Sequence, residues 1–484
     1  MGIVIKQSLR NTVIIYIAFA IGGINALFLY TRFLTDEYYG LVTYLLSTAN
    51  ILMPLTAFGV QYSIVKFFSS YTTKIERDKF LSSVLLLPLF IAIPIAIIGN
   101  VFYEQISSYL SIKNPIIKNY TFVIYLVAVA TAYFEIFYAW AKVQMQSVFG
   151  NIIKEMFTRV TVMLLLVLVF LKIINAQQFI YMLTVAYFLR MLIMMLYALK
   201  LYKPKFTLQF PSNFTEVLKY SLYIILAGSA GAILLDIDKF MLPQKKAIEL
   251  AAFYGVGVYI ASVIEAPGRA MSHILQPLTA KALNEGNNEE VASLYKRSSI
   301  NLLLICGLIF LLVNTNLHEL YYLLPTDYSQ GAIVVLMISF AKLFTMFLGS
   351  NGAIISNSQY YKILLPYGIA MALSVYFLND WLIDEYGMNG AALSTLLVVF
   401  IFNLIKLWYV KKKFGIVPTT NKTVPIIIVI TALFGIFYFW NFSFHPIINI
   451  ILKSAFLTLV YLFLVVKMNI SKDINNLIYK FVKF

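Results

Sequence analysis

The sequence predicts an all-α integral membrane protein with about fourteen transmembrane helices. Of its 484 residues, 61% are hydrophobic and only 12% are charged, so a water-soluble fold would lack polar residues for its surface. About fourteen apolar stretches run along the chain, each close to the ~20 residues that a helix needs to cross a bilayer. Because backbone amides in hydrocarbon must be paired within the segment, these stretches are expected to be helices. The ~10-residue alternation of membrane-spanning strands is not seen.

The expected helices fall into two sets of seven along the chain. The first set covers residues 8–31, 41–65, 80–102, 120–141, 155–171, 178–199 and 217–241. The second set covers residues 251–273, 298–314, 331–353, 363–377, 390–410, 424–440 and 447–467. In the third helix, Pro88 and Pro94 predict a kink, because proline removes a backbone hydrogen bond and its ring clashes with the preceding turn.

Positive charge is concentrated on alternate connections between these helices. The excess is roughly four to one, which by the positive-inside rule places that side, and both termini, in the cytoplasm. The net charge of +16 therefore comes mainly from the basic residues that orient the helices in the membrane. No soluble basic and aromatic module is present to carry a nucleic-acid partner. We expect a protein integral to the cytoplasmic (inner) membrane, in contact with membrane lipids.

A short motif occurs twice at corresponding positions. Tyr39-Gly40-Leu-Val-Thr-Tyr44 opens the second expected helix, Tyr254-Gly255-Val-Gly-Val-Tyr259 opens the eighth, and a proline follows each motif, Pro54 and Pro267. Both copies run in the same direction, which predicts two pseudo-symmetric six-helix bundles related by an axis along the membrane normal, followed by two extra helices and an interfacial tail. These three parts are residues 1–205, 206–413 and 414–484.

Four motifs carry a resemblance to a known family. They are Thr31-Arg32-Phe33-Leu34-Thr-Asp-Glu-Tyr-Tyr39-Gly40, Asp238-Lys239-Phe-Met-Leu242, Tyr254-Gly255 through Pro267, and Glu385-Tyr386-Gly387-Met-Asn-Gly390-Ala391-Ala392. In their order and spacing the chain resembles, over nearly its whole length, the oligosaccharide and polysaccharide flippases of the O-antigen transporter type. These belong to the multidrug/oligosaccharidyl-lipid/polysaccharide exporter superfamily.

The resemblance implies a transporter and not an enzyme. Its expected cargo is an undecaprenyl-pyrophosphate-type oligosaccharide, moved from the cytoplasmic to the periplasmic leaflet for cell-surface polysaccharide biosynthesis, where a polymerase is an expected partner. The residues agree, since no zinc-protease helix motif, no phosphate-binding glycine loop and no paired cysteines occur. The three histidines lie on separate segments, so no metal or other cofactor is expected. Coupling to H+ or Na+ is left open.

Sugar and pyrophosphate cannot cross hydrocarbon unaided, so a cationic, water-filled cavity and alternating access are expected, and ionisable residues inside the expected helices are candidates for binding. Lys342, deep in the tenth helix, either binds an anionic ligand or pairs with a carboxylate such as Glu135 in the fourth. Arg190 in the sixth helix either binds substrate or extends to the cytoplasmic interface. Asn25 in the first helix is a candidate for sugar hydroxyls, although the glycines beside it also suit close helix packing.

Glu265 and Arg269 flank Pro267 near the inner end of the eighth helix. Four residues apart, they form either a simple intrahelical pair or a phosphate-binding arginine that its glutamate orients. We predict that Arg269→Ala and Lys342→Ala abolish export without preventing insertion.

Four charged residues lie at the outer ends of the first and seventh helices: Arg32, Asp236, Asp238 and Lys239. Opposite charges at these positions are suited to a gate whose ion pairs separate when the periplasmic side of the cavity opens. The alternative is that they are ordinary interfacial charges at helix ends. The two aspartates are also candidates for a coupling ion.

Two other functions remain open. A cation-coupled multidrug exporter has the same architecture, but it should carry net negative charge where organic cations bind, whereas the candidate cations here outnumber the acids. A membrane-embedded polymerase or ligase should have a sizeable outer loop, and the outer connections are short, at roughly fifteen residues or fewer.

Overall fold

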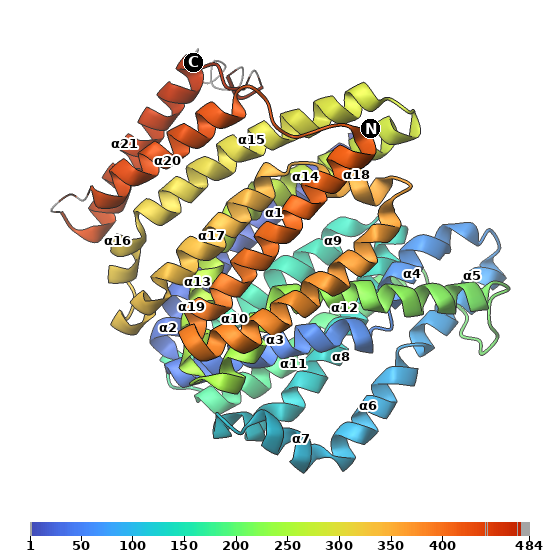
Figure 1. Cartoon of the computed structure of the whole chain (residues 1–484). Coiled ribbons are helices and arrows are strands. Elements are labelled where there is room, and N and C mark those ends of the chain that lie inside the picture. Colours follow the sequence, from blue (N-terminus) through green and yellow to red (C-terminus); the bar gives the residue numbers. More distant parts are fainter. Residues whose placement is uncertain (1, 441, 443, 472, 476–484) are drawn as a thin grey trace. The chain divides into compact units, whose positions relative to one another are not determined.

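The computed structural model describes residues 2–440, 442, 444–471 and 473–475, with side chains from residue 13 onward except those of residues 227 and 273. Every regular element in these residues is a helix (Figure 1). The chain divides into two compact units. Unit 1 comprises Met1–Ala252 and Tyr367–Gly387, and unit 2 comprises Phe253–Pro366 and Met388–Phe484. The three-part division expected from the repeat stays a prediction, and most of the expected interfacial tail lies outside the described residues.

Unit 1 is built from the first twelve α-helices, two π-helical stretches and two 3-10 turns. In order they are α1 (Gly2–Ile24), η1 (Asn25–Leu29), α2 (Tyr30–Phe33), α3 (Asp36–Thr56), α4 (Val60–Phe67), η2 (Phe68–Ser70), α5 (Lys74–Leu86), α6 (Leu89–Val101), α7 (Tyr103–Leu110), η3 (Pro115–Tyr120), α8 (Thr121–Val143), α9 (Ser147–Ile152), η4 (Ile153–Phe157), α10 (Thr158–Phe170), α11 (Ala176–Leu201) and α12 (Phe214–Lys245).

Most of unit 2 follows α13 (Glu249–Ser262), whose first residues still belong to unit 1. The remaining elements are η5 (Val263–Glu265), α14 (Ala266–Asn284), α15 (Asn288–Thr315), α16 (Leu317–Tyr322), η6 (Thr326–Gly331), α17 (Ala332–Phe347), α18 (Asn351–Asn357), η7 (Tyr361–Ile363), α19 (Leu364–Phe414), α20 (Thr423–Phe439) and α21 (Pro446–Lys467). Helix α19 contributes residues 367–387 to unit 1. Within unit 2, the antiparallel pair α20–α21 packs beside α15 (Figure 1).

The all-helical membrane architecture is confirmed. Ten helices in the described part of the chain are long and apolar enough to cross a membrane, or up to eleven if the bent pair α3–α4 forms one span. Each of the fourteen expected positions is largely helical, but not every one of them is a separate long span. Helix α20 is short, the η4–α10 segment carries Lys154, Glu155 and Arg159, and the eleventh and twelfth expected helices are the two parts of α19 on either side of Gly387. The number fourteen therefore stays a prediction.

Local sequence explains where several helices begin and break. Asn175 caps α11 in a reciprocal capping box with Gln178, which satisfies amides that the first turn leaves unpaired. The bend of 48° between α3 and α4 follows Pro54 and passes through Gly59, whose positive φ of 64° suits a residue without a Cβ. In α19, Gly387 has φ 57° and ψ −132°, so this element is two helices joined at a kink.

Each unit has its own apolar core. In unit 1, α3 packs against both α8 and α12, and α8 also packs against α11 and α4. Trp140 and Phe134 on α8 are completely buried there. In unit 2, α15 packs against α14, α17 and α20, with Cys306 and Leu311 completely buried. The cysteine is a small apolar residue of the core, as its isolation in the sequence predicts.

The glycine of the first repeat motif allows a close approach of two backbones. A Cβ at residue 40 would overlap the carbonyl of Ile248, in the connection between α12 and α13. We therefore expect Gly40→Ala to lower the free energy of unfolding by about 1–3 kcal/mol, because neither backbone can move away cheaply. Thermal unfolding of the purified protein measures this. Gly99→Ala is the matched control, because a Cβ on that helical glycine would meet no atom within 4 Å; an equal loss for both variants would contradict the explanation.

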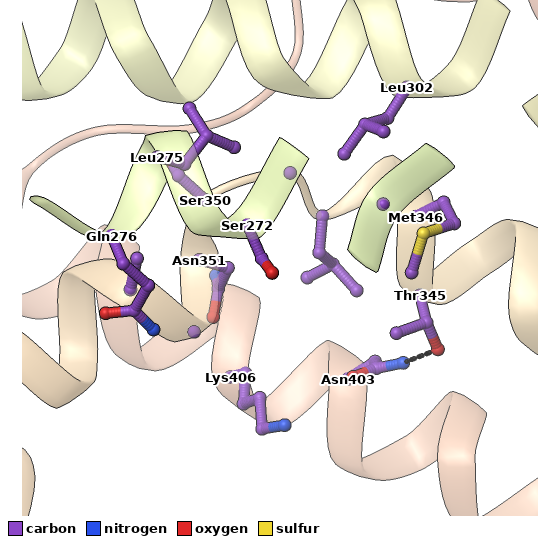
Figure 2. A pocket seen from close by; sticks show the side chains of 15 residues that line it. Ser272, Leu275, Gln276, Leu302, Thr345, Met346, Ser350, Asn351, Asn403 and Lys406 are labelled. Atoms are coloured by element: carbon purple, nitrogen blue, oxygen red, sulfur yellow. Dashed lines mark hydrogen bonds between the residues drawn. The ribbon is translucent and has the colours of Figure 1, made fainter. Parts of the chain in front are cut away.

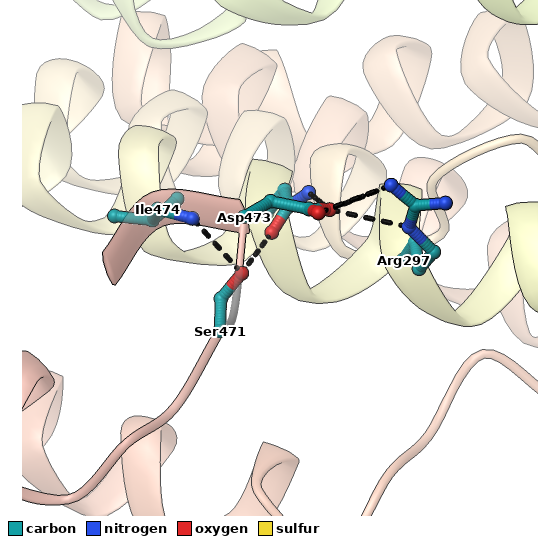
Figure 3. A network of polar contacts seen from close by, with 5 residues as sticks. Arg297, Ser471, Asp473 and Ile474 are labelled. Carbon is teal, nitrogen blue, oxygen red and sulfur yellow. Dashed lines mark hydrogen bonds and ion pairs between the residues drawn. The ribbon is translucent and has the colours of Figure 1, made fainter. Parts of the chain in front are cut away.

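The last described residues are fastened to α15. Asp473 accepts hydrogen bonds from Arg297 Nη2 at 3.0 Å, Arg297 Nε at 3.2 Å and Asn301 Nδ2 at 3.0 Å. Ser471 Oγ donates to Asn301 Oδ1 at 2.6 Å and accepts from the Ile474 amide at 3.4 Å (Figure 3). The bidentate guanidinium–carboxylate geometry fixes the direction of the chain as it leaves α21.

This contact has a defined pH dependence. The pKa of Asp473 lies below its ordinary value of 3.8. The hydrogen bond from Asn301 is the largest cause, and the hydrogen bonds and positive charge of Arg297 add to it. A lowered pKa in the folded state means that the contact is fully present above the ordinary value and is lost only as the pH falls through the lowered one. We expect the protection of the amides of residues 473–475, relative to an unstructured peptide at the same pH, to stay constant throughout pH 5–8 in hydrogen–deuterium exchange. Asp473→Asn should accelerate that exchange at pH 7, and Glu289→Gln at the exposed start of α15 should not.

Candidate functional site

A cluster of charged side chains lies inside unit 1, where α8, η4, α10 and α11 meet. Lys154 Nζ is 2.7 Å from Glu135 Oε1, and only 14% of the Glu135 side chain is exposed. One turn further on, Arg159 Nη1 is 2.9 Å from Glu155 Oε2. Three of these four residues, Glu135, Glu155 and Arg159, lie in segments that hydropathy assigns to membrane helices, and Lys154 directly precedes one of them. Glu135 is thus satisfied within unit 1, by Lys154.

Arg190 belongs to the same cluster and is almost fully buried, with 7% of its surface exposed. Its guanidinium carbon lies 3.9 Å from the centroid of the Phe134 ring, a cation–π contact. Its Nε has no hydrogen-bond partner among the described atoms, and Glu135 and Glu155 are close enough to attract it. The structure therefore places Arg190 in the helix bundle and not at the interface. Whether it binds substrate stays a prediction.

Asn25 lies beside this cluster. It begins the π-helical stretch η1, and its Nδ2 donates to the Arg159 carbonyl at 2.7 Å. The second π-helical stretch, η4, contacts α1 directly. Wide turns of this kind often occur at functional sites, because they displace side chains from the regular helical register. Here they bring Asn25, Lys154 and Glu155 to one region of unit 1.

A second group of charges lies inside unit 2, on η5, α14 and α17. Lys342 Nζ donates to Glu265 Oε2 at 2.6 Å, and Arg269 Nη2 lies 3.4 Å from Glu265 Oε1. We call these three residues the ion triad. The predicted pair of Glu265 with Arg269 is present, and the carboxylate partner of Lys342 is Glu265, where Glu135 had been the expected structural partner. The side chains of Lys342 and Glu265 are each 23% exposed, and that of Arg269 is 41% exposed.

The residues predicted to form a gate all belong to unit 1. Arg32 lies in the last turn of α2 and is exposed. Asp236 accepts from Lys239 Nζ at 2.9 Å and from Asn50 Nδ2 at 3.2 Å. Asp238 is buried and accepts from Asn379 Nδ2 at 2.7 Å. Their roles in gating or ion coupling stay predictions.

Sequence reasoning missed several members of these groups. Lys142 and Lys154 count as loop charges when only hydropathy is considered, yet Lys154 pairs with Glu135, and Lys142 Nζ lies 4.4 Å from the Tyr138 ring centroid. Lys406 on α19 lines a polar cavity of unit 2. The signal for Lys406 was available, because an ionisable residue within an apolar span is a functional candidate by the rule that identified Lys342.

Both groups carry an excess of positive charge. In unit 1, the four cations Lys142, Lys154, Arg159 and Arg190 face the two carboxylates Glu135 and Glu155, a formal net charge of +2. In unit 2, the ion triad has two cations and one carboxylate, a formal net charge of +1. Such sites favour an anion, because each surplus cation in a poorly hydrated bundle lowers its energy when it gains a counter-charge.

Comparison with known proteins decides the family. Residues 7–266, more than half of the chain, match the family described as polysaccharide biosynthesis protein. The chain belongs to this family. No curated protein matches it significantly in sequence. Its fold is shared with solved transporters of the exporter superfamily that the sequence motifs resemble.

Three solved structures show the fold that this polysaccharide biosynthesis family member adopts. The lipid II flippase MurJ in an inward closed conformation is 15% identical, with a TM-score of 0.73 over 96% of this chain and 100% of MurJ. A MOP superfamily transporter from Pyrococcus furiosus is 14% identical, with a TM-score of 0.59 over 86% of this chain and 96% of that chain. An inward-facing multidrug resistance MATE transporter is 14% identical, with a TM-score of 0.58 over 86% and 94%. All three are transporters or flippases, not enzymes.

Proposed function

We propose that the protein is a flippase that moves an undecaprenyl-pyrophosphate-type oligosaccharide from the cytoplasmic to the outer leaflet for cell-surface polysaccharide biosynthesis. It acts in the cytoplasmic membrane with both termini in the cytoplasm, by alternating access around a cationic cavity, and delivers its cargo to a polymerase. The family of the chain and a shared fold with a lipid II flippase support this function. The proposal needs no cofactor.

The observation that carries the proposal is the ion triad. Lys342 and Arg269 both contact the single carboxylate of Glu265, so the ion triad has a formal net charge of +1. A pyrophosphate carries negative charge and offers several oxygens to a guanidinium and an ammonium group. The surplus of cations in unit 1 supports the same class of cargo.

Energetics favour export of such a cargo. An ion in hydrocarbon costs many kcal/mol, so the head group needs a polar route. With the cell interior negative, outward movement of each negative charge gains about 2.3 kcal/mol per 100 mV, and a doubly charged head group gains nearly 5 kcal/mol. The membrane potential is therefore sufficient in principle, without coupling to H+ or Na+.

The apolar tail needs only an apolar environment. Unit 1 contains a cavity of about 380 Å³ bordered by α3, α6, α7 and α8 and lined mainly by apolar side chains, among them Leu52, Ile95 and Phe122. The outward face of α6 exposes Phe90 and Ile97, as expected where a helix contacts lipid. This surface supports a cargo with a long hydrocarbon chain.

A cation-coupled multidrug exporter is the second candidate, because a multidrug transporter shares the fold. Such a protein needs net negative charge where an organic cation binds. The ion triad and the cluster of unit 1 have the opposite sign, which favours the flippase.

The deciding experiment measures leaflet exchange in proteoliposomes. Purified full-length protein is reconstituted with a fluorescent undecaprenyl-pyrophosphate oligosaccharide, and the outer leaflet is probed with a membrane-impermeant quencher. We expect protein-dependent exchange that accelerates when an imposed potential is negative on the side from which the lipid departs. Absence of exchange, together with uptake of an organic cation, would replace the flippase by the exporter.

A further inference from the structure

Unit 2 contains a polar cavity of about 250 Å³ next to the ion triad. Taking about 30 Å³ for each water in the liquid, it has room for roughly eight waters, or for one sugar ring. Ser272 and Gln276 on α14, Asn351 on α18, and Asn403 and Lys406 on α19 line it (Figure 2). Hydroxyl, amide and ammonium groups from three helices therefore border one space.

The polar groups are held in place. Asn403 Nδ2 donates to Thr345 Oγ1 at 2.9 Å, Asn351 Nδ2 donates to Tyr295 Oη at 2.6 Å, and Ser272 Oγ donates to the Arg269 carbonyl at 2.7 Å. Ser272 keeps oxygen lone pairs that can accept from a ligand hydroxyl. Sites whose polar groups are fixed by neighbours recognise ligands without a large ordering cost.

The lining excludes several ligand classes. Among the described residues, no aspartate or glutamate borders the cavity, so this lining offers no counter-charge to a metal ion or an organic cation. Leu275, Leu302 and Met346 form an apolar part of the wall, which an inorganic anion alone does not use. A sugar has both hydroxyl groups and an apolar C–H face, and it matches both parts of the wall.

The position of the cavity relative to the ion triad is specific. Ser272 follows Arg269 by three residues on α14, and Thr345 follows Lys342 by three residues on α17. The cavity residues on these two helices therefore lie about one helical turn, roughly 5 Å along the helix axes, beyond the residues of the ion triad. This is the order of groups in a glycosyl pyrophosphate, whose sugar is bonded directly to the phosphate.

We propose that this cavity binds the first sugar of the cargo while the ion triad binds its pyrophosphate, an inference that rests on the proposed function. Lys406 adds positive charge to the wall of this cavity and therefore favours a sugar that carries acidic groups or many hydroxyl groups. Unit 2 thus recognises the glycosyl pyrophosphate as one head group and binds it more tightly than the bare lipid pyrophosphate.

Gly352 provides a direct test, because a Cβ there would meet no atom within 4 Å and the residue lines the cavity. Gly352→Leu fills the space, and Gly352→Ala is the matched control. The probes are citronellyl pyrophosphate and its glucose, galactose and N-acetylglucosamine glycosides, with affinities measured on full-length protein in nanodiscs. For the tightest glycoside we expect Gly352→Leu to weaken binding by about tenfold or more. Binding of the bare pyrophosphate should be unchanged, which also shows that the variant is folded, and Gly352→Ala should bind like the wild type.

Lys406→Met should weaken glycoside binding as well, and Lys411→Met, on the exposed end of the same helix, should not. The inference is overturned if wild-type protein binds no glycoside more tightly than the bare compound, or if Gly352→Leu changes both affinities equally. A different result would contradict the proposed function and leave this inference intact. In that case proteoliposomes with wild-type protein would not exchange lipid-linked sugar, but the wild type would still prefer the glycoside and Gly352→Leu would still lose that preference.

Discussion

Replacing Lys342 with alanine should abolish transport of a lipid-linked oligosaccharide while the protein still inserts and folds. The substitution removes one of the two cations that share Glu265, so the formal charge of the ion triad falls from +1 to zero. Loss of one partner from a partly buried charge contact costs about 2–5 kcal/mol, which weakens pyrophosphate binding by roughly thirtyfold or more. Binding of citronellyl pyrophosphate and exchange in proteoliposomes both measure the effect.

Two further variants separate ligand binding from simple structural pairing. Lys342→Arg keeps the positive charge and should retain part of the activity. Glu265→Gln raises the formal charge of the ion triad to +2, so it should maintain or increase pyrophosphate affinity. If the Lys342–Glu265 contact serves only to hold α17 against η5, both Lys342→Ala and Glu265→Gln will lower stability and binding together. Normal exchange by Lys342→Ala would remove Lys342 from the site.

Hydropathy was sufficient to predict the helical class and the position of nearly every helix. The reason is that each span satisfies its backbone within itself, so it depends on local sequence only. Proline effects were also local, and α5 and α6 are indeed separate helices with Pro88 between them. Gly387 agrees as well, because its non-helical φ and ψ separate the two helices of α19 within the connection expected between the eleventh and twelfth helices.

The contacts of charged residues were less predictable. The pair of Glu265 and Arg269 lies within four residues, and the sequence predicted it. Lys342 and Glu265 are 77 residues apart, and their contact depends on how α17 and η5 are rotated about their axes. The π-helical stretch η4 changes the register by which Lys154 reaches Glu135. Such rotations are set by packing of whole helices, and no local pattern records them.

Glu319→Ala should lower the stability of unit 2 more than the substitutions of single charged residues described above. Glu319 on α16 and Lys453 on α21 are the most deeply buried ion pair of the described residues, with 3% and 2% of their side chains exposed and an N–O distance of 3.8 Å. Removal of the glutamate takes away the carboxylate that lies 3.8 Å from the buried lysine. A cost of about 3–5 kcal/mol is typical of breaking such a pair. Thermal unfolding of the purified full-length protein measures the loss.

The double variant Glu319→Leu/Lys453→Met tests whether unit 2 requires the ion pair itself or only the absence of an unbalanced buried charge. Both charges disappear and the volume is kept, so stability should return to the wild-type level or exceed it. Lys281 and Glu285 form a control pair at a similar distance, 3.7 Å, but their side chains are 66% and 56% exposed. Glu285→Ala should leave the unfolding midpoint nearly unchanged, because water already screens that pair. If the double variant is as unstable as Glu319→Ala, then the ion pair itself fastens α21 to α16. If it recovers, apolar packing and the Asn316–Ser454 hydrogen bond at 3.1 Å are enough to hold these helices together.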